Sequence, residues 1–230
     1  GQIALDHADR IFAAGEELVS TLQRTGDALP PLRVGALSTL SRNFQIRFLA
    51  PVLGRDDVAL SLKSGGADQL FAALTALALD VVLTTDPPVS GPDRSFETHR
   101  LDAQDAGLHG TPDLVQRGDL RTLLAEVPVI VPTESAIRSG FDGLVTRLGV
   151  RPRIRAEVDD MAMVRLLARE GAGLAVAPSV VFADEIATGR IAAVRVDLGI
   201  IETFYAVTVP RNFPHPLLAE LLGADIVGRA

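Results

Sequence analysis

The sequence predicts an α/β protein built from two lobes of similar size, each with a parallel β-sheet. Short apolar segments of strand length alternate with segments of helical periodicity over residues 32–110, and the same alternation recurs over residues 112–203. A strand–helix–strand–helix–strand order requires a parallel sheet with right-handed crossovers. A further strand and helix follow the second run, so we expect the chain to return to the first lobe.

In the first lobe, we expect strands where apolar residues are consecutive or alternate with polar ones, and helices where they recur every three to four positions. The expected strands are Leu32–Leu37, Val58–Leu62 and Val81–Thr85, and the helices between them are Ser41–Leu53 and Ala67–Leu79. A loop rich in Pro and Gly then precedes two weaker strands, Phe96–Leu101 and Ala106–Thr111.

The second lobe begins with a short helix and repeats the alternation. Its expected helices are Arg117–Ala125, Ile137–Leu148, Met161–Arg169 and Phe182–Thr188, and its expected strands are Val127–Val131, Ile154–Val158, Leu174–Ala177 and Ile191–Val196. The last strand, Phe204–Val209, and a helix at Pro216–Leu222 complete the chain.

These elements predict the domain boundaries. Lobe I should comprise residues 32–110 and 206–230, and lobe II residues 112–204, with the backbone crossing between them near Gly110–Pro112 and near Thr203–Ala206. Ligands of open α/β sheets bind at the carboxyl ends of strands, where helix N-termini supply N–H donors. We therefore expect a ligand site in a cleft between the lobes.

Residues 1–26 are expected to form an amphipathic helix ahead of the lobes. Small and apolar residues recur at spacings of four and three from Ala4 to Leu22, as in the seam of a heptad repeat. The helix either packs on its own domain or dimerises as a linker from an upstream domain, and the pattern favours both equally. Gly26 and the Pro30–Pro31 pair end it.

The composition excludes several classes of function. The 22 basic and 29 acidic residues give a net charge of −7, which argues against a basic face for nucleic acid. The absence of Cys excludes disulfides, thiolate catalysis and Cys-ligated metals. The longest apolar stretch, Leu70–Leu83, is interrupted by polar residues and is shorter than the roughly 20 residues of a membrane span.

No catalytic or metal-binding constellation stands out, and we expect no cofactor and no metal. The four His residues do not lie at metal-ligand spacing, and there is neither a nucleophile elbow nor a phosphate loop. His99 and His109 could meet across a hairpin, although a surface pair is the simpler interpretation. Candidates for acid–base chemistry are limited to Asp86, Asp159 and His99, so an enzyme is a minor alternative.

Small hydroxyl, glycine and acidic residues follow the predicted strands of both lobes. They are Ser38, Thr39, Gly65 and Asp86 in the first lobe and Thr133, Ser135 and Asp159 in the second. Helix N-capping explains each of them alone, but hydroxyls on both sides of a cleft together favour a site for a small polar ligand. The carboxylates would repel an anion and suit a cation or an amine better, so the class of ligand stays open.

Four segments resemble the effector-binding region of LysR-type transcriptional regulators. They are the helix Ala4–Leu22, the strand Leu32–Gly35 leading to Ser38, LDVVLTTDPP (Leu79–Pro88) and VRLLAREGAGLAVAPSVV (Val164–Val181). Their order along nearly the whole chain is more specific than any one of them. Two segments, EVDDMAMVRLLA and VIVPTESAIRSGFDGL, are further similar to the NhaR-type subgroup, the regulators of sodium/proton antiporter genes.

The resemblance implies a type 2 periplasmic-binding-protein fold in a cytoplasmic protein that forms homodimers or homotetramers. It also implies a winged helix-turn-helix upstream of the linker helix and outside these 230 residues, through which the protein would bind DNA. Family effectors bind between the lobes, which implies contacts from Ser38, Thr39, Gly65, Thr133 and Ser135, with Asp86, Asp159 and Phe204 also lining the site. A solute-binding protein of a transporter shares the fold and is the main alternative.

Overall fold

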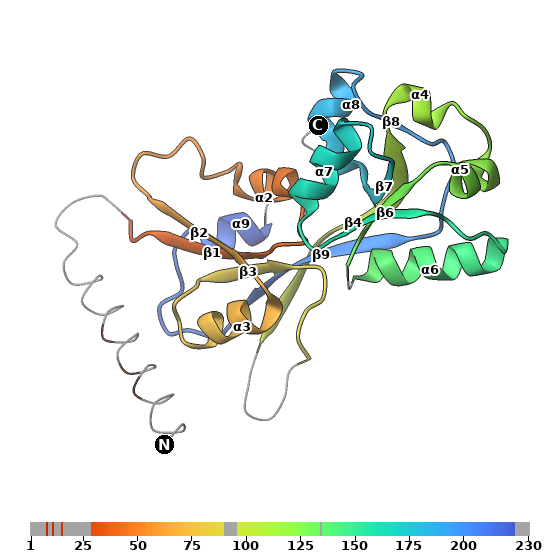
Figure 1. Ribbon diagram of the computed structural model, residues 1–230. Coiled ribbons are helices and arrows are strands. Elements are labelled where there is room, and N and C mark those ends of the chain that lie inside the picture. The colour runs from red at the N-terminus through yellow and green to blue at the C-terminus, as the bar shows by residue number, and fades with distance from the viewer. Residues whose placement is uncertain are drawn as a thin grey trace. The chain divides into compact units, whose positions relative to one another are not determined.

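The computed structural model describes residues 29–89, 96–133 and 135–223, together with Ala8, Ile11 and Gly15. Its packing divides the chain into two compact units (Figure 1). Unit 1 contains residues 1–37, 45–102 and 204–230, and unit 2 contains residues 38–44 and 103–203. The linker helix expected over residues 1–26 lies outside the described residues, apart from the three named above, which are helical.

Unit 1 is organised around three parallel strands, as the sequence predicts. They are β1 (Leu32–Leu37), β2 (Leu60–Gly65) and β3 (Val81–Thr84), which pair in the order β2-β1-β3. The last strand, β9 (Ile201–Thr208), adds to this sheet antiparallel to β3. The central strands β1 and β3 are almost entirely buried, whereas β2 lies at the edge and is mostly exposed.

The helices that connect these strands are shorter than predicted. Helix α2 (Arg42–Leu49) ends before Pro51, whose ring cannot continue a helix, and turns occupy the next residues. Helix α3 (Ala67–Thr75) ends before Leu77, which has a φ of 62° in the left-handed region. The short helix α9 (Leu218–Gly223) closes the described part of unit 1.

Strand β4 (Glu97–Gly110) is one continuous strand of 14 residues, so the prediction of two separate strands was wrong. The polar run Asp102–Asp105 breaks the apolar pattern and looks like a loop in the sequence. The division between the units falls inside this strand, after Asp102, and not at Gly110–Pro112 as expected. The chain passes back to unit 1 after Thr203, and residues 38–44 of the α2 region also belong to unit 2.

Unit 2 is built on β5 (Val129–Pro132), β6 (Ile154–Val158) and β7 (Leu174–Pro178), which are parallel and ordered β7-β5-β6. Strand β4 pairs antiparallel with β7, and the two-residue strand β8 (Ala192–Ala193) pairs with β4. The remaining elements are the helices α4 (Pro112–Val115), α5 (Leu120–Glu126), α6 (Ala136–Leu148), α7 (Met161–Arg169) and α8 (Ala183–Ala187), and the 3₁₀ turn η1 (Ser179–Phe182).

The strand order of unit 2 determines on which face of the sheet each helix lies and at which edge it begins. The crossover from β5 to β6 and the crossover from β6 back to β7 run in opposite directions, so right-handedness places α6 and α7 on opposite faces of the sheet (Figure 1). Both helices start directly after a strand, so their N-termini lie at the carboxyl edge of the same sheet. No helix among the described residues is both long and apolar enough to cross a membrane.

Candidate functional site

The carboxyl edge of the unit 2 sheet gathers the polar residues that follow β5, β6 and β7. The N–H of Thr133 donates to the carbonyl of Val158 at 2.9 Å, which holds the end of β5 beside the end of β6. Thr133 is half-buried, and Asp159, the next residue after β6, is exposed. Thr133 and Asp159 are therefore neighbours at one edge, as the sequence predicts for residues that follow parallel strands.

Ser135 begins helix α6 and caps it. Its Oγ accepts a hydrogen bond from the N–H of Arg138 at 3.2 Å, so the hydroxyl proton stays available to a ligand. The guanidinium of Arg138 lies 3.0 Å from Asp142 and 2.9 Å from Glu157, and the hydrogen bond with Glu157 is the main cause of its raised pKa. Arg138 is thus neutralised by its own partners.

Helix α7 begins beside the turn that follows β1. Asp160, and not Asp159, caps this helix, because its carboxylate accepts from the N–H of Ala162 at 2.8 Å. The N–H of Met161 donates to the carbonyl of Ser38 at 3.4 Å. Ser38 and Thr39, both half-buried, belong to unit 2 through these contacts and lie next to the first turn of α7.

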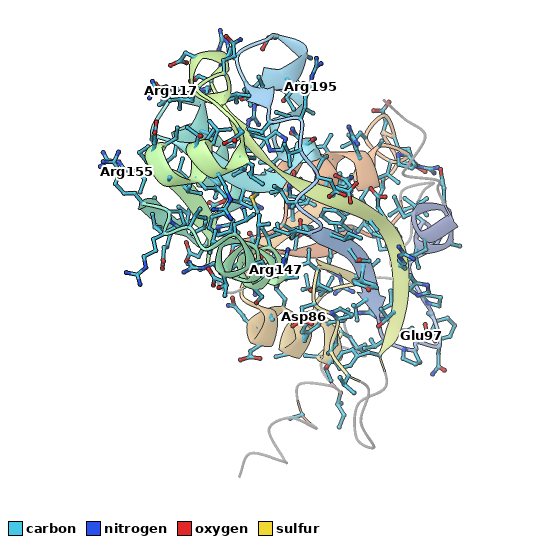
Figure 2. The ribbon with its side chains drawn as sticks, turned by 90° about the vertical axis from the view of Figure 1, so that its right-hand side faces the viewer. Asp86, Glu97, Arg117, Arg147, Arg155 and Arg195 are labelled. Carbon is cyan, nitrogen blue, oxygen red and sulfur yellow. The ribbon has the colours of Figure 1, made fainter. Side chains whose placement is uncertain are left out.

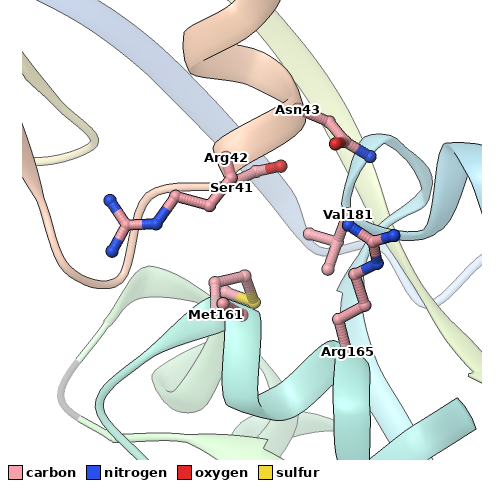
Figure 3. Close-up of a pocket in the computed structure, with 7 residues that line it drawn as sticks. Ser41, Arg42, Asn43, Met161, Arg165 and Val181 are labelled. Carbon is pink, nitrogen blue, oxygen red and sulfur yellow. The ribbon is translucent and has the colours of Figure 1, made fainter.

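A small pocket of about 20 Å³ opens between the start of α2 and the first two turns of α7. Figure 3 shows Arg165 reaching from α7 toward Asn43 and Val181, whereas the guanidinium of Arg42 points away from them. Arg165 donates to the buried carboxylate of Glu185 at 2.7 Å, and the amide of Asn43 donates to the carbonyl of Val180 at 3.0 Å. The pocket has room for about one water molecule, so it extends the site without forming a ligand cavity of its own.

Sequence reasoning missed the residues of this pocket. Asn43 and Arg165 lie inside helices, and the sequence pattern predicts each of them only as a polar residue on the helix surface. Only the packing of α2 against α7 brings them together, and no local pattern in the sequence signals that contact.

The buried imidazole of His109 contacts Ser179, an exposed residue that directly follows β7. The His109 Nε2 lies 3.1 Å from the Oγ of Ser179, and the imidazole stacks on Phe182 at a centroid distance of 4.8 Å. Burial lowers the pKa of His109 to about 4, so the ring is neutral at physiological pH. The prediction of a surface pair of His99 and His109 was wrong, because both lie on β4 and His109 is only 1% exposed.

Three predicted site residues belong to unit 1. Gly65 is the last residue of β2. A Cβ added at this position would lie 2.9 Å from the Oε1 of Gln69. Asp86 is exposed after β3 (Figure 2), and its N–H donates to the Oγ1 of Thr84 at 3.0 Å. Phe204 is fully buried in β9, so its ring packs in the core and does not line a surface as the resemblance implied.

Acid–base chemistry finds little support in this arrangement. His99 lies 3.5 Å from the Oγ1 of Thr208 in unit 1, and Asp159 is in unit 2. Among the described residues, no group of three His, Asp or Glu side chains is placed to hold a metal ion. The geometry therefore describes a binding edge made of hydroxyls and helix N-termini.

The fold and this edge together define a type 2 periplasmic-binding-like domain, in which two α/β units share long strands. The chain belongs to the LysR substrate-binding domain family, whose model matches residues 26–224. The predicted family is thereby confirmed. No curated protein sequence matches the chain.

Solved structures similar to this chain are regulatory proteins of the LysR type. The regulatory domain of HypT from Salmonella typhimurium with bound bromide is 16% identical, with a TM-score of 0.66 over 88% of this chain and 96% of that one. The CcmR regulatory domain from Synechocystis PCC6803 in complex with 2-PG is 17% identical, with a TM-score of 0.65 over 85% and 97%. ArgP from Mycobacterium tuberculosis is 19% identical, with a TM-score of 0.67 over 97% and 76%.

Proposed function

We propose that this chain senses a small effector at the carboxyl edge of the unit 2 sheet and transmits its binding to a DNA-binding module of a cytoplasmic transcriptional regulator. Ser38, Thr39, Thr133, Ser135 and Asp159 are the proposed contacts in unit 2. Gly65 and Asp86 of unit 1 remain predicted contacts.

The observation that carries this proposal is the convergence of donors at one edge. A backbone hydrogen bond at Thr133 holds the end of β5, which leads into α6, beside the end of β6, and another at Met161 holds the N-terminus of α7 beside the turn after β1. Backbone N–H groups at a helix N-terminus and side-chain hydroxyls are the groups that bind small polar ligands. The HypT domain with bromide and the CcmR domain with 2-PG support a small ligand for a domain of this fold.

The proposed transmission uses the oligomer. A ligand shifts the equilibrium between two arrangements of the protein only by its difference in affinity for them, and a coupling of about 1–3 kcal/mol suffices. The heptad pattern of residues 1–26 supports a linker helix that joins two copies in a homodimer or homotetramer. DNA would be contacted through an N-terminal winged helix-turn-helix.

We also propose the NhaR-type subgroup as the nearest functional class. This finer assignment is supported by EVDDMAMVRLLA, which covers the end of β6 and most of α7, and by VIVPTESAIRSGFDGL, which covers all of β5 and most of α6. Both segments supply the proposed contacts, so a shared effector chemistry would be encoded there.

Replacing Thr133 with Val tests the site. The substitution keeps the shape of the side chain and removes the hydroxyl, so we expect at least about tenfold weaker effector binding with folding retained. A thermal-shift screen of anions, including bromide and 2-PG, and of primary amines would first find a ligand for the wild-type chain.

Thr146→Val is the matched control, because Thr146 lies on the same helix as the proposed site but its hydroxyl is exposed and donates to the carbonyl of Asp142. We expect it to bind the ligand as the wild type does. Equal affinities for the wild type and Thr133→Val would remove this edge as the effector site.

A further inference from the structure

A carboxylate, an imidazole and a hydroxyl of unit 1 converge where the neighbouring strands β4 and β9 meet. Glu97 and His99 lie on β4 and share one of its faces, because side chains alternate along a strand. Thr208 is the last residue of β9. Its Oγ1 lies 3.3 Å from the Oε2 of Glu97 and 3.5 Å from the Nε2 of His99.

Hydrogen bonding accounts for only part of this cluster. An O–H···O hydrogen bond is usually about 2.5–3.0 Å long, and both separations exceed that range. The hydroxyl of Thr208 has a single proton, which it can donate to the carboxylate or to the imidazole but not to both. A cation shared by the three side chains would use a lone pair of each at the same time.

The separations match those between the ligands of a four-coordinate metal ion. Zn²⁺ binds imidazole nitrogen and carboxylate oxygen at about 2.0–2.2 Å in tetrahedral geometry, so neighbouring ligand atoms lie about 3.3–3.6 Å apart. The distances of 3.3 Å and 3.5 Å from the Thr208 Oγ1 fall within this range. A donor set of one nitrogen and two oxygens suits Zn²⁺ better than Mg²⁺ or Ca²⁺, which prefer oxygen ligands alone.

The surroundings of the cluster favour the entry of a cation. Glu97 is exposed at the start of β4 (Figure 2), whereas Thr208 is 5% exposed, so the cluster opens to solvent on the side of Glu97. Within the described part of the chain, Glu97 forms no ion pair. Arg100 follows His99 and lies on the opposite face of β4, and Arg211 is engaged with Asp80 at 2.9 Å.

We propose that Glu97, His99 and Thr208 bind a divalent transition-metal ion of the zinc class, with water as the remaining ligand. Glu97 supplies the negative charge, the Nε2 of His99 supplies the nitrogen ligand, and the buried hydroxyl of Thr208 supplies the third. The expectation of no metal site depended on spacing along the chain, which does not show that Thr208 lies beside His99. All three residues belong to unit 1, so the proposal is independent of the effector site proposed in unit 2.

The proposal is tested with Zn²⁺ and Co²⁺ as probes on the whole chain without a histidine tag. Isothermal calorimetry at neutral pH should show one Zn²⁺ per chain, and an excess of Mg²⁺ should not displace it. Co²⁺ should give the visible absorption of a four-coordinate ion. By ¹⁵N NMR, Zn²⁺ should shift the Nε2 resonance of His99 and leave that of His215, whose Nε2 contacts the carbonyl of Pro30, unchanged.

Variants of each ligand show whether the three side chains act together. Glu97→Gln and His99→Gln should each bind Zn²⁺ at least about tenfold more weakly. Thr208→Val removes the hydroxyl and should weaken binding about tenfold, whereas Thr208→Ser keeps it and should bind within about threefold of the wild type. Thr98→Val, at an exposed position on the opposite face of β4, is the matched control and should bind as the wild type does. Circular dichroism would verify the fold of each variant.

Three results would overturn the metal site. Equal Zn²⁺ affinities of His99→Gln and the wild type would show that the ion binds elsewhere. Equal affinities of Thr208→Val and the wild type would remove the third ligand, and with it the tetrahedral geometry. Saturation only at millimolar Zn²⁺, with displacement by Mg²⁺, would assign a general attraction to surface charge. None of these results bears on Thr133→Val, which tests the effector site of unit 2 separately.

Discussion

The two units differ in how their buried polar groups are satisfied. In unit 1, each buried polar side chain in the described residues has a partner: Asp80 binds Arg33 and Arg211, Thr84 binds Asp86, Thr208 contacts Glu97 and His215 binds Pro30 and Leu217. In unit 2, the Nδ1 of His109 and the Oε2 of Glu185 are buried without a hydrogen-bond partner among the described residues.

This difference indicates that the two units have different roles. A buried polar group without a partner costs about 1–3 kcal/mol, so folding alone gives no reason to keep two of them in one unit. Unsatisfied and pKa-shifted groups concentrate where proteins bind ligands. This contrast is consistent with the effector site that we propose in unit 2, and it leaves unit 1 with the fully paired polar interior of a stable scaffold.

The largest expected effect is in unit 1, at the ion cluster around Asp80. This carboxylate is 3% exposed and accepts from Arg33 at 2.8 Å and from Arg211 at 2.9 Å. Asp80→Asn would remove the buried carboxylate that the guanidinium of Arg211 contacts, so we expect a loss of about 3–5 kcal/mol in the free energy of unfolding. Urea denaturation followed by circular dichroism measures it.

Asp57→Asn is the matched control for Asp80→Asn. Asp57 forms a 2.6 Å ion pair with Arg55 at the surface of the same unit, where solvent screens the interaction. We expect a change too small to resolve. If both substitutions cost the same, the buried cluster would not be what stabilises unit 1, and the contrast between the units would disappear.

The second prediction concerns the stability of unit 2 at acidic pH. The folded state holds His109 neutral down to about pH 4, whereas the unfolded chain protonates it near pH 6.5. The unfolded state therefore binds more protons than the folded state between these two pH values. The free energy of unfolding falls as the pH falls, and at pH 4 it is about 3 kcal/mol lower than at neutral pH. Urea titrations at pH 7 and pH 4.5 would show the loss.

His109→Leu should reduce that loss of stability, because it removes the titrating group and leaves only the exposed hydroxyl of Ser179 without its partner. The difference between wild type and variant at the two pH values isolates His109 from all other titrating groups. An identical loss in both proteins would show that His109 does not limit the stability of unit 2 in acid.

Much of the fold could be predicted from periodicity, because strands and helices of an α/β protein differ in their apolar spacing. β1, β6 and α7 have the predicted bounds, and the parallel pairing of both units is confirmed. β4 was missed because the polar run Asp102–Asp105 breaks the apolar pattern, whereas in the sheet β4 lies between the strands β9 and β7. Tertiary pairing of this kind leaves no local pattern.

The site was predictable only in part. Thr133, Ser135 and Asp159 follow strands, and the rule for parallel sheets places such residues at one edge. The sequence does not show that Asn43 and Arg165 share a pocket or that Phe204 is in the core. Each of these depends on which face of an element packs against a neighbour far away in the chain.

The smallest expected effect compares the helix starts of the two units. Ser135 caps α6 with its hydroxyl, whereas Gly66 precedes α3 without a side-chain hydrogen bond. Ser135→Ala should therefore destabilise unit 2 by about 1 kcal/mol. Ser139→Ala, at an exposed position inside the same helix, should change stability by less than about 0.5 kcal/mol. Gly66→Ser should stabilise unit 1 by a few tenths of a kcal/mol, since a Cβ there meets no atom within 4 Å. Urea midpoints measure all three. If Ser135→Ala left the midpoint unchanged, the Ser135 hydroxyl would not be stabilising the helix, and its remaining role would be contact with the ligand alone.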